Sequence, residues 1–78
     1  MPTVLRIDGY RFYFHSHEPD EPPHVHVDKA GATAKIWLTP VGLARNIGFR
    51  GPELSAVLKH VTAHRDALLE SWHDFFGH

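Results

Sequence analysis

The chain has no cysteine among its 78 residues, which excludes disulfide bonds and thiolate metal sites. It also lacks a long apolar run and a signal-peptide pattern, which argues against a membrane-bound protein. Basic residues are not in excess, and the formal net charge of −1 excludes a strongly basic nucleic-acid binder but not a local basic patch. These absences predict a soluble cytoplasmic protein that needs no cofactor.

The length predicts one domain covering residues 1–78, and a hydrophobic content of 42% with 22% charged residues is typical of globular proteins. Histidine is abundant, with eight residues, and its side chain binds metals and transfers protons near neutral pH. Because so small a core gains stability from association, we expect either a protein partner or a homodimer.

The first strands are predicted at Thr3–Ile7 and Tyr10–His15, because Asp8-Gly9 between them is typical of a type I′ hairpin turn. One face of this hairpin is apolar and carries Leu5, Ile7, Tyr10, Phe12 and Phe14. The other face is cationic and aromatic and carries Arg6, Arg11, Tyr13 and His15. Arg6 is expected opposite Arg11, which costs energy unless an anion or a carboxylate lies between them.

A second hairpin is predicted after an acidic, proline-rich loop at residues 17–23. Its strands are His24–Asp28 and Thr33–Leu38. The expected register places Asp28 opposite Thr33, His26 opposite Lys35 and His24 opposite Trp37. Alternation along the strands then gathers His24, His26, Lys35 and Trp37 on one face, and Val25, Val27, Ala34, Ile36 and Leu38 on the other.

The second half of the chain is expected to be helical. Thr39-Pro40 is typical of a helix start, which predicts a short helix over Val41–Arg45. A long helix is predicted from Pro52 to Trp72–Phe76, with Gly77 as its stop. Its apolar stripe contains Leu54, Val57, Leu58, Val61, Leu68 and Trp72, with Leu69 at the edge. The expected fold is therefore α+β: about four antiparallel strands in two hairpins, a short helix and one long C-terminal helix packed on the sheet. The pattern leaves open which sheet face this helix covers.

Several blocks resemble the bacterial DUF4160 family: GYRFYFHSHEPDEPPHVHV, AKIWL followed by proline, LARN followed by GF, and HRDALLESWHDFF. The resemblance covers nearly the whole chain, and EPPHVHV is its most specific block. It implies a small intracellular bacterial protein of unknown function. Members are often encoded beside DUF2442-type proteins, which implies a toxin–antitoxin-type pair with that protein as partner. The resemblance implies no established catalytic residues.

The face with His24, His26 and Lys35 has the groups that metal-independent RNA cleavage needs: a base, an acid and a cation for the phosphate. We therefore predict these three as candidate catalytic residues of a ribonuclease-like activity. Candidate RNA-binding residues are Arg6, Arg11, Tyr13, Trp37, Arg45 and Arg65, with the aromatic side chains stacking on bases.

Two alternatives remain open for His24 and His26. His24 and His26 are able to bind a divalent metal with His15, Asp28, Glu18 or Glu21, although Lys35 beside His26 would repel a cation. Both histidines are also able to hold the proline-rich loop by hydrogen bonds, in a non-enzymatic protein-interaction module. Arg65 interrupts the apolar stripe, either as a structural arginine or as one that reaches into a site. His60 and His64 lack the glutamate of a zinc-protease motif and are assigned to the helix surface.

Overall fold

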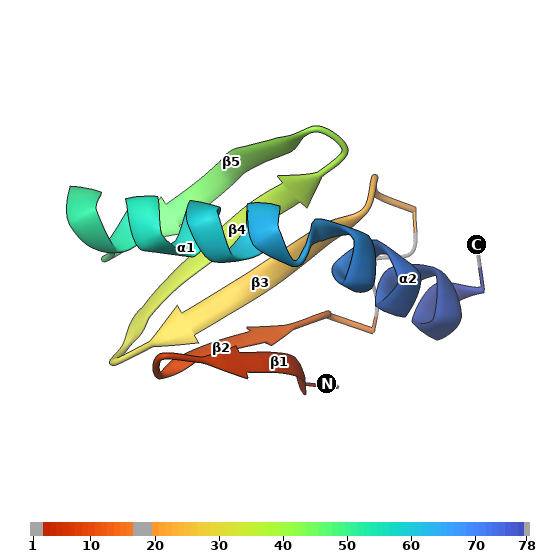
Figure 1. Cartoon of the computed structure of the whole chain (residues 1–78), viewed down its shortest axis with the longest axis horizontal. Helices are drawn as coiled ribbons and strands as arrows, with labels where there is room; N and C mark the ends of the chain where they lie inside the picture. The colour runs from red at the N-terminus through yellow and green to blue at the C-terminus, as the bar shows by residue number, and fades with distance from the viewer. Residues whose placement is uncertain (1–2, 17–19, 78) are drawn as a thin grey trace.

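The computed structural model describes residues 3–16 and 20–77. The strands are β1 (Thr3–Ile7), β2 (Tyr10–Tyr13), β3 (His24–Lys29), β4 (Ala32–Leu38) and β5 (Val41–Ile47). They are followed by α1 (Gly51–Ala63) and α2 (Arg65–Phe76). The five strands form one antiparallel sheet in the order β1-β2-β3-β4-β5, so each strand pairs with its neighbours along the chain (Figure 1). The fold is α+β, as expected, with one strand more than predicted.

Both predicted hairpins are present in the predicted register. Asp8 and Gly9 have positive φ angles of 52° and 83°, as a type I′ turn requires. In the first hairpin Arg6 pairs with Arg11 and Ile7 with Tyr10. In the second, the pairs are His24 with Trp37, His26 with Lys35, and Asp28 with Thr33. The turn dipeptides and the alternation of apolar residues were therefore sufficient to predict these two units.

The predicted short helix over Val41–Arg45 is wrong, because these residues belong to β5. Thr39 and Pro40 form the turn between β4 and β5 instead of starting a helix, and the peptide bond between them is cis. β5 pairs along the whole of β4, from Leu38 with Val41 to Thr33 with Ile47, with a bulge beside Lys35 and Ile36. The backbone hydrogen bonds offered by β4 outweigh the helical propensity of Leu, Ala and Arg in this segment.

The single long helix is also a wrong prediction, since the chain bends at His64 and forms two helices. His64 has ψ of 14°, outside the helical range, although hydrogen bonds from His64 N to His60 O and from Leu68 N to His64 O bridge the junction. Just before the bend, the Thr62 hydroxyl donates to the carbonyl of Leu58 at 2.8 Å. Such a bond to the preceding turn is a known cause of helix bending. Gly77 ends α2 in the left-handed conformation, as predicted.

Both helices lie across the same face of the sheet (Figure 1). The predicted stripe is confirmed, because Val57, Val61, Leu68 and Trp72 are buried. From the sheet, the core receives Tyr10, Phe12, Phe14, Val25, Val27, Ala34, Ile36 and Leu38. This answers the question that the sequence left open: the helices cover the valine and isoleucine face, and neither described helix lies on the opposite face. Among the described helices, none is long and apolar enough to cross a membrane.

Candidate functional site

The sheet face opposite the helices, here called the open face, carries polar side chains in two rows across the strands. In the first row, pairing aligns Tyr13 with His26, His26 with Lys35, and Lys35 with Arg45. In the second, it aligns Arg6 with Arg11, Arg11 with Asp28, and Asp28 with Thr33. Directly opposed residues on antiparallel strands have neighbouring side chains on the same face. The sheet thus joins residues that are up to 39 positions apart in the sequence, since Arg6 and Arg45 stand on its two outer strands.

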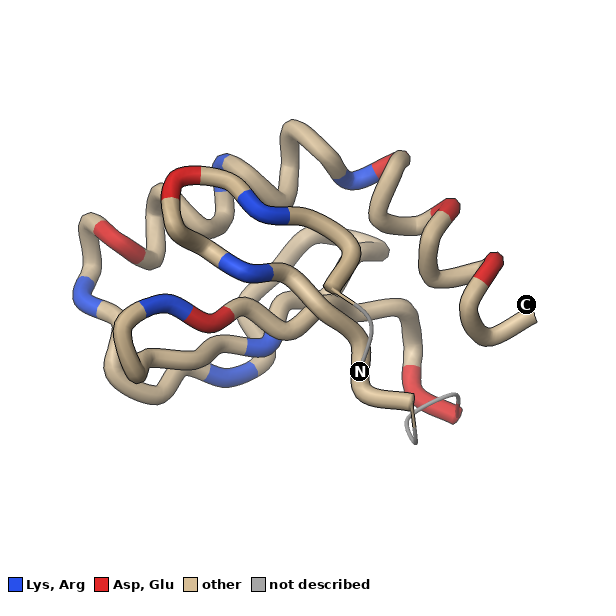
Figure 2. The backbone as a smooth tube through the Cα atoms, turned by 90° about the horizontal axis from the view of Figure 1, so that it is seen from below, with Lys and Arg blue, Asp and Glu red and all other residues tan. Residues whose placement is uncertain are grey.

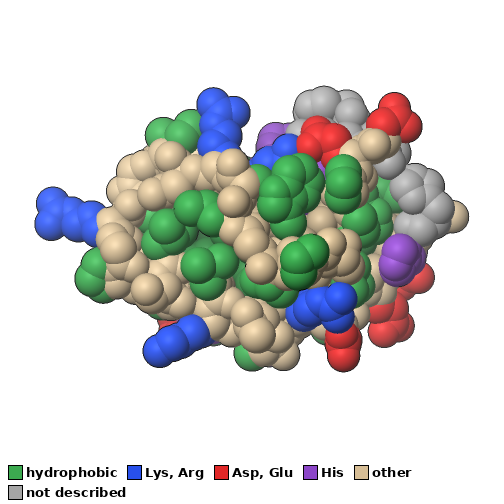
Figure 3. Space-filling view, turned by 90° about the horizontal axis from the view of Figure 1, so that it is seen from above, with side chains coloured by type: hydrophobic (Ala, Val, Ile, Leu, Met, Phe, Trp, Pro, Cys, Tyr) green, Lys and Arg blue, Asp and Glu red, His purple; other side chains and the backbone are tan. Residues whose placement is uncertain are grey.

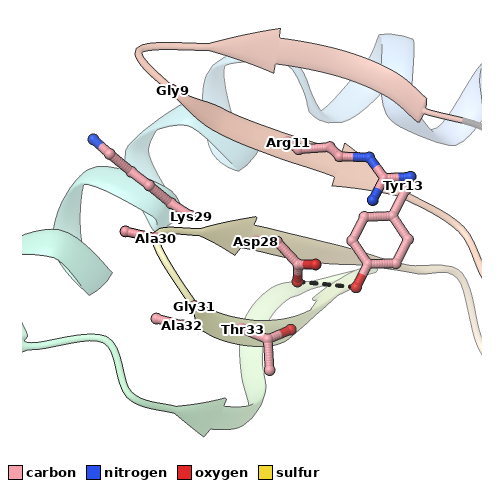
Figure 4. A pocket seen from close by; sticks show the side chains of 9 residues that line it. All are labelled: Gly9, Arg11, Tyr13, Asp28, Lys29, Ala30, Gly31, Ala32 and Thr33. Atoms are coloured by element: carbon pink, nitrogen blue, oxygen red, sulfur yellow. Dashed lines mark hydrogen bonds between the residues drawn. The ribbon is translucent and has the colours of Figure 1, made fainter.

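Tyr13 is the last residue of β2 and lies on the open face, and only 6% of the residue is exposed. Its ring stacks on that of His26 at 5.5 Å between centroids, and the Arg11 guanidinium lies 4.6 Å from the ring centroid. Its hydroxyl donates to Asp28 Oδ1 at 2.9 Å (Figure 4). Burial raises the pKa of Tyr13 above its usual 10.0, and the hydrogen bond and negative charge of Asp28 raise it further. The phenol is therefore held as a neutral donor.

His24 is fully buried, which corrects the expectation of an accessible His24 beside His26. The rings of both histidines are 5.1 Å apart, but that of His24 also lies 5.0 Å from Trp72 of α2. Its Nδ1 lies 2.9 Å from the carbonyl oxygen of Pro22. A carbonyl only accepts hydrogen bonds, so Nδ1 donates. His24 thus holds the proline-rich loop, as the structural alternative proposed, and has no exposed surface from which to contact a ligand.

Lys35 and Trp37 lie together on the open face, as predicted. The Lys35 ammonium is 4.9 Å from the centroid of the Trp37 ring and forms a salt bridge with Glu21 of the proline-rich loop. The edge of the His24 ring is turned toward Trp37, with 5.7 Å between centroids. Lys35 therefore joins this loop to β4, and part of its charge is neutralised by Glu21.

Two arginines at the outer strands of the open face are exposed and form no hydrogen bond or ion pair with the described part of the chain: Arg6 on β1 and Arg45 on β5. Four inter-strand spacings, about 19 Å, separate the two strands that carry them. Arg65 is not part of this face, because it belongs to α2 and donates from Nε to the carbonyl of Leu38 at 2.8 Å. The observed contact of Arg65 is therefore a structural one between α2 and β4.

The open face contains two shallow hollows that share Tyr13 and Thr33 in their walls. The first, of about 550 Å³, is lined by Arg11, Asp28 and the β3–β4 turn (Figure 4). The second, of about 330 Å³, is lined by His15, His26, Lys35, Arg45 and Ile47. Both are within the size range of small-ligand sites.

Charge is unevenly distributed over the two layers. Most lysines and arginines lie on or beside the strands, whereas Asp66, Glu70 and Asp74 follow α2 (Figure 2). A chain with a net charge of −1 thus has a sheet face on which cationic side chains outnumber carboxylates. The net charge did not exclude a local basic patch, and the open face has one.

The histidine-based metal alternative receives no support from the part of the chain that is described. No three histidine, cysteine or acidic side chains within residues 3–16 and 20–77 are arranged to hold a metal ion. His15 and His26 are in ring contact at 4.0 Å between centroids. Glu18, one of the suggested additional ligands, lies outside the described residues.

The role of Asp28 beside Arg11 and Tyr13 was not predicted, although Asp28 was considered as a metal ligand. Its position depends on the pairing of β2 with β3, which joins the two hairpins. The intervening proline-rich loop gives no register signal, so only the pattern of apolar residues on both strands could have suggested this alignment.

The fold and the open face together define a class: a small α+β domain in which a five-stranded meander is covered on one side by a bent pair of helices. The chain belongs to the family described as "Domain of unknown function (DUF4160)", whose model matches residues 9–73. Neither a curated protein nor a solved structure matches the chain.

Proposed function

We propose that the open face binds single-stranded RNA. The observation that carries this proposal is the row of Tyr13, His26, Lys35 and Arg45 across the four strands β2 to β5, on the face without helices. Arg45 ends this row on β5 and is exposed, and Arg6, which belongs to the second row on β1, is exposed as well. The spacing of about 19 Å between β1 and β5 suits a ligand with charges spaced along its length, such as a phosphodiester backbone.

A single strand suits this surface better than a duplex. Reading the major groove of a duplex requires a protruding helix or two-stranded ribbon, and both helices lie on the other face. Single-stranded RNA instead spreads over a sheet and exposes its phosphates and base edges to it. Because the Tyr13 ring already contacts His26 and Arg11, phosphate contacts rather than stacking on Tyr13 would supply most of the affinity.

The test is the affinity of the pure protein for single-stranded RNA, measured by fluorescence anisotropy over a range of salt concentrations. We expect Arg6→Ala and Arg45→Ala each to weaken binding and to reduce the slope of log affinity against log salt by about 0.7, the value for one lost phosphate contact. Lys59→Ala is the matched control, because Lys59 is an exposed cation on α1. Binding that is undetectable, or equally sensitive to the loss of Lys59, would contradict the proposal.

We further propose that the protein is the toxin-like component of a toxin–antitoxin-type pair in the cytoplasm, with a DUF2442-type protein as partner. In this proposal His26 takes the proton of the RNA 2′-hydroxyl, whose oxygen attacks the phosphorus, and the 5′-oxygen leaves and is protonated by water. Lys35 holds the phosphate, while the buried His24 positions the loop. Wild type, His26→Ala and Lys35→Ala would be expressed in a host without the neighbouring gene. Growth arrest and RNA cleavage by the wild type, both lost in His26→Ala, are the expected results. Equal growth of all three strains would eliminate the toxin role and leave RNA binding to be judged by affinity.

A second candidate function is a non-enzymatic protein-interaction module, favoured by the free edge of β5. Two of the exposed large hydrophobic residues of the described chain lie on this strand, Leu43 at 43% and Ile47 at 49% exposure. Viewed from this side, the molecule displays hydrophobic side chains across its middle, and most of the visible charged side chains lie toward its outline (Figure 3). An unprotected strand edge pairs readily with another strand, from a partner or from a second copy. A stable complex with the neighbour's product that is lost in Leu43→Lys, with no RNA binding by the wild type, would favour this function.

A further inference from the structure

Asp28 is a carboxylate in the middle of a cationic surface. It forms part of the wall of the 550 Å³ hollow, beside Arg11, Tyr13 and Thr33 (Figure 4). A carboxylate repels phosphate, so it weakens a surface that binds only the RNA backbone. It does, however, accept hydrogen bonds from the N–H groups of a base, and this makes it a candidate for base recognition.

The Asp28 side chain is held in place and retains an acceptor. Oδ1 accepts the Tyr13 hydroxyl at 2.9 Å, and the backbone of Asp28 lies between β2 and β4, where it pairs with Arg11 and Thr33. Within residues 3–16 and 20–77, no other side chain forms a hydrogen bond or ion pair with this carboxylate. Oδ2 is thus available at the hollow, and Oδ1 has a second lone pair.

We infer that the hollow at Asp28 is a base-recognition subsite that selects guanine. Guanine is the RNA base with two adjacent donors on its pairing edge, N1–H and the N2 amine, and these match the two oxygens of a carboxylate. Adenine and cytosine place an unprotonated ring nitrogen beside their single amine, and uracil places carbonyls on both sides of its N3–H. Each of these would bring an acceptor against the carboxylate.

Arg11 provides the complementary donors. Its Nε donates to the hydroxyl of Thr3, while its guanidinium lies over the Tyr13 ring and faces the hollow (Figure 4). A guanine bound to Asp28 by N1 and N2 has its O6 carbonyl on the same edge, where an arginine N–H donates to it. Asp28 offers two acceptors beside the donors of Arg11, and this arrangement matches the donor–donor–acceptor order of the guanine pairing edge. This subsite depends on the proposed RNA-binding function and assigns its base preference.

The experiment compares oligouridines that carry one central guanosine, inosine, adenosine or cytidine, using fluorescence anisotropy with the wild-type protein. We expect guanosine to bind about tenfold more tightly than adenosine or cytidine, a typical value for a bidentate base contact. Inosine lacks the N2 amine and should give an intermediate affinity. Asp28→Asn should remove the preference without weakening the binding of plain oligouridine. Glu21→Gln, which alters another carboxylate near this face, should retain the preference.

Equal affinity of the wild type for all four oligonucleotides would overturn the guanine assignment but leave RNA binding intact. A guanosine preference that persists in Asp28→Asn would overturn it as well. Binding of none of the four would overturn both the assignment and the proposed function. Chemical-shift changes at Asp28 and Thr33 of the wild type on adding guanosine monophosphate, and their absence with uridine monophosphate, provide a readout that needs no variant.

Discussion

Arg65 Nε donates to the carbonyl oxygen of Leu38 at 2.8 Å, joining the first residue of α2 to the last residue of β4 across 27 positions of sequence. The helix bends at the residue before this arginine, and Leu38 itself is fully buried. The Leu38 N–H in turn donates to the carbonyl of Pro23 at 3.0 Å. One strand end therefore ties together the helical layer and the proline-rich loop.

Replacement of Arg65 by alanine should lower the free energy of unfolding by about 1–2 kcal/mol, because a partly buried, charge-assisted hydrogen bond to a carbonyl is lost. In a domain of this size, that corresponds to a fall in Tm of about 4–16 °C. Asp66→Ala removes the exposed partner of the Arg65 guanidinium and is the control. Thermal denaturation should separate the two variants, and equal Tm values would contradict a structural role for the bond to Leu38.

His24→Ala should be more destabilising, by about 2–4 kcal/mol, because it creates a cavity beside Trp72 and leaves the Pro22 carbonyl without its donor. Urea denaturation followed by circular dichroism measures this difference. His73→Ala is the matched control, since His73 is an exposed histidine of α2. A small effect of both substitutions would show that the loop does not depend on His24.

The raised pKa of Tyr13 predicts a loss of stability in alkaline solution. Because the folded state binds this proton more tightly than the unfolded state, its contribution is fully present below the ordinary pKa of 10.0 and is lost as the pH rises from there through the pKa of the folded protein. Chemical denaturation below and above pH 10.0 should show a steeper loss for the wild type than for Tyr13→Phe. Asp28→Asn should lower the pKa of Tyr13, as read from its ring resonances. An unchanged titration would exclude Asp28 as a cause.

Two glycines offer a test of the backbone: Gly42 lies within β5, and Gly48 directly follows it. Gly48 has φ of +96°, and an added Cβ would lie 3.3 Å from the Cβ of Ala32. Gly48→Ala should therefore cost about 1–2 kcal/mol, since the left-handed conformation is unfavourable for alanine. At Gly42 an added Cβ meets no atom within 4 Å, so Gly42→Ala should be neutral or stabilise by about 0.5 kcal/mol. Thermal denaturation of both variants measures the difference in stability. A destabilised Gly42→Ala would contradict the expectation that an added Cβ is tolerated in β5.

The hairpins were predictable because their signals are local. Asp8-Gly9 determines the first turn, and the alternation around His24 and His26 determines which side chains share a face. The pairs His26 with Lys35 and His24 with Trp37 follow directly. The DUF4160 membership was also visible in these blocks.

The errors occurred where local preference and tertiary structure disagree. Val41–Ile47 contains helix-forming residues, and its strand state depends on the edge that β4 offers. No proline or glycine near His64 predicts the bend there, which follows the hydrogen bond from the Thr62 hydroxyl to the preceding helical turn. The burial of His24 depends on the position of Trp72, which belongs to a different layer. A strand pattern gives the direction of a side chain but not what packs over it from elsewhere.

The strand order has a consequence for how the protein folds. Each strand pairs with its immediate chain neighbours, so the contact order of the sheet is low and the entropy lost in closing each loop is small. During synthesis the five strands are made before α1 and α2. The apolar face of the sheet therefore stays uncovered until both helices are made, whereas no helix has to cover the open face. Folding should therefore be fast once the C-terminal helices are available. Before that point, a truncated chain exposes an uncovered apolar sheet, which is prone to aggregation.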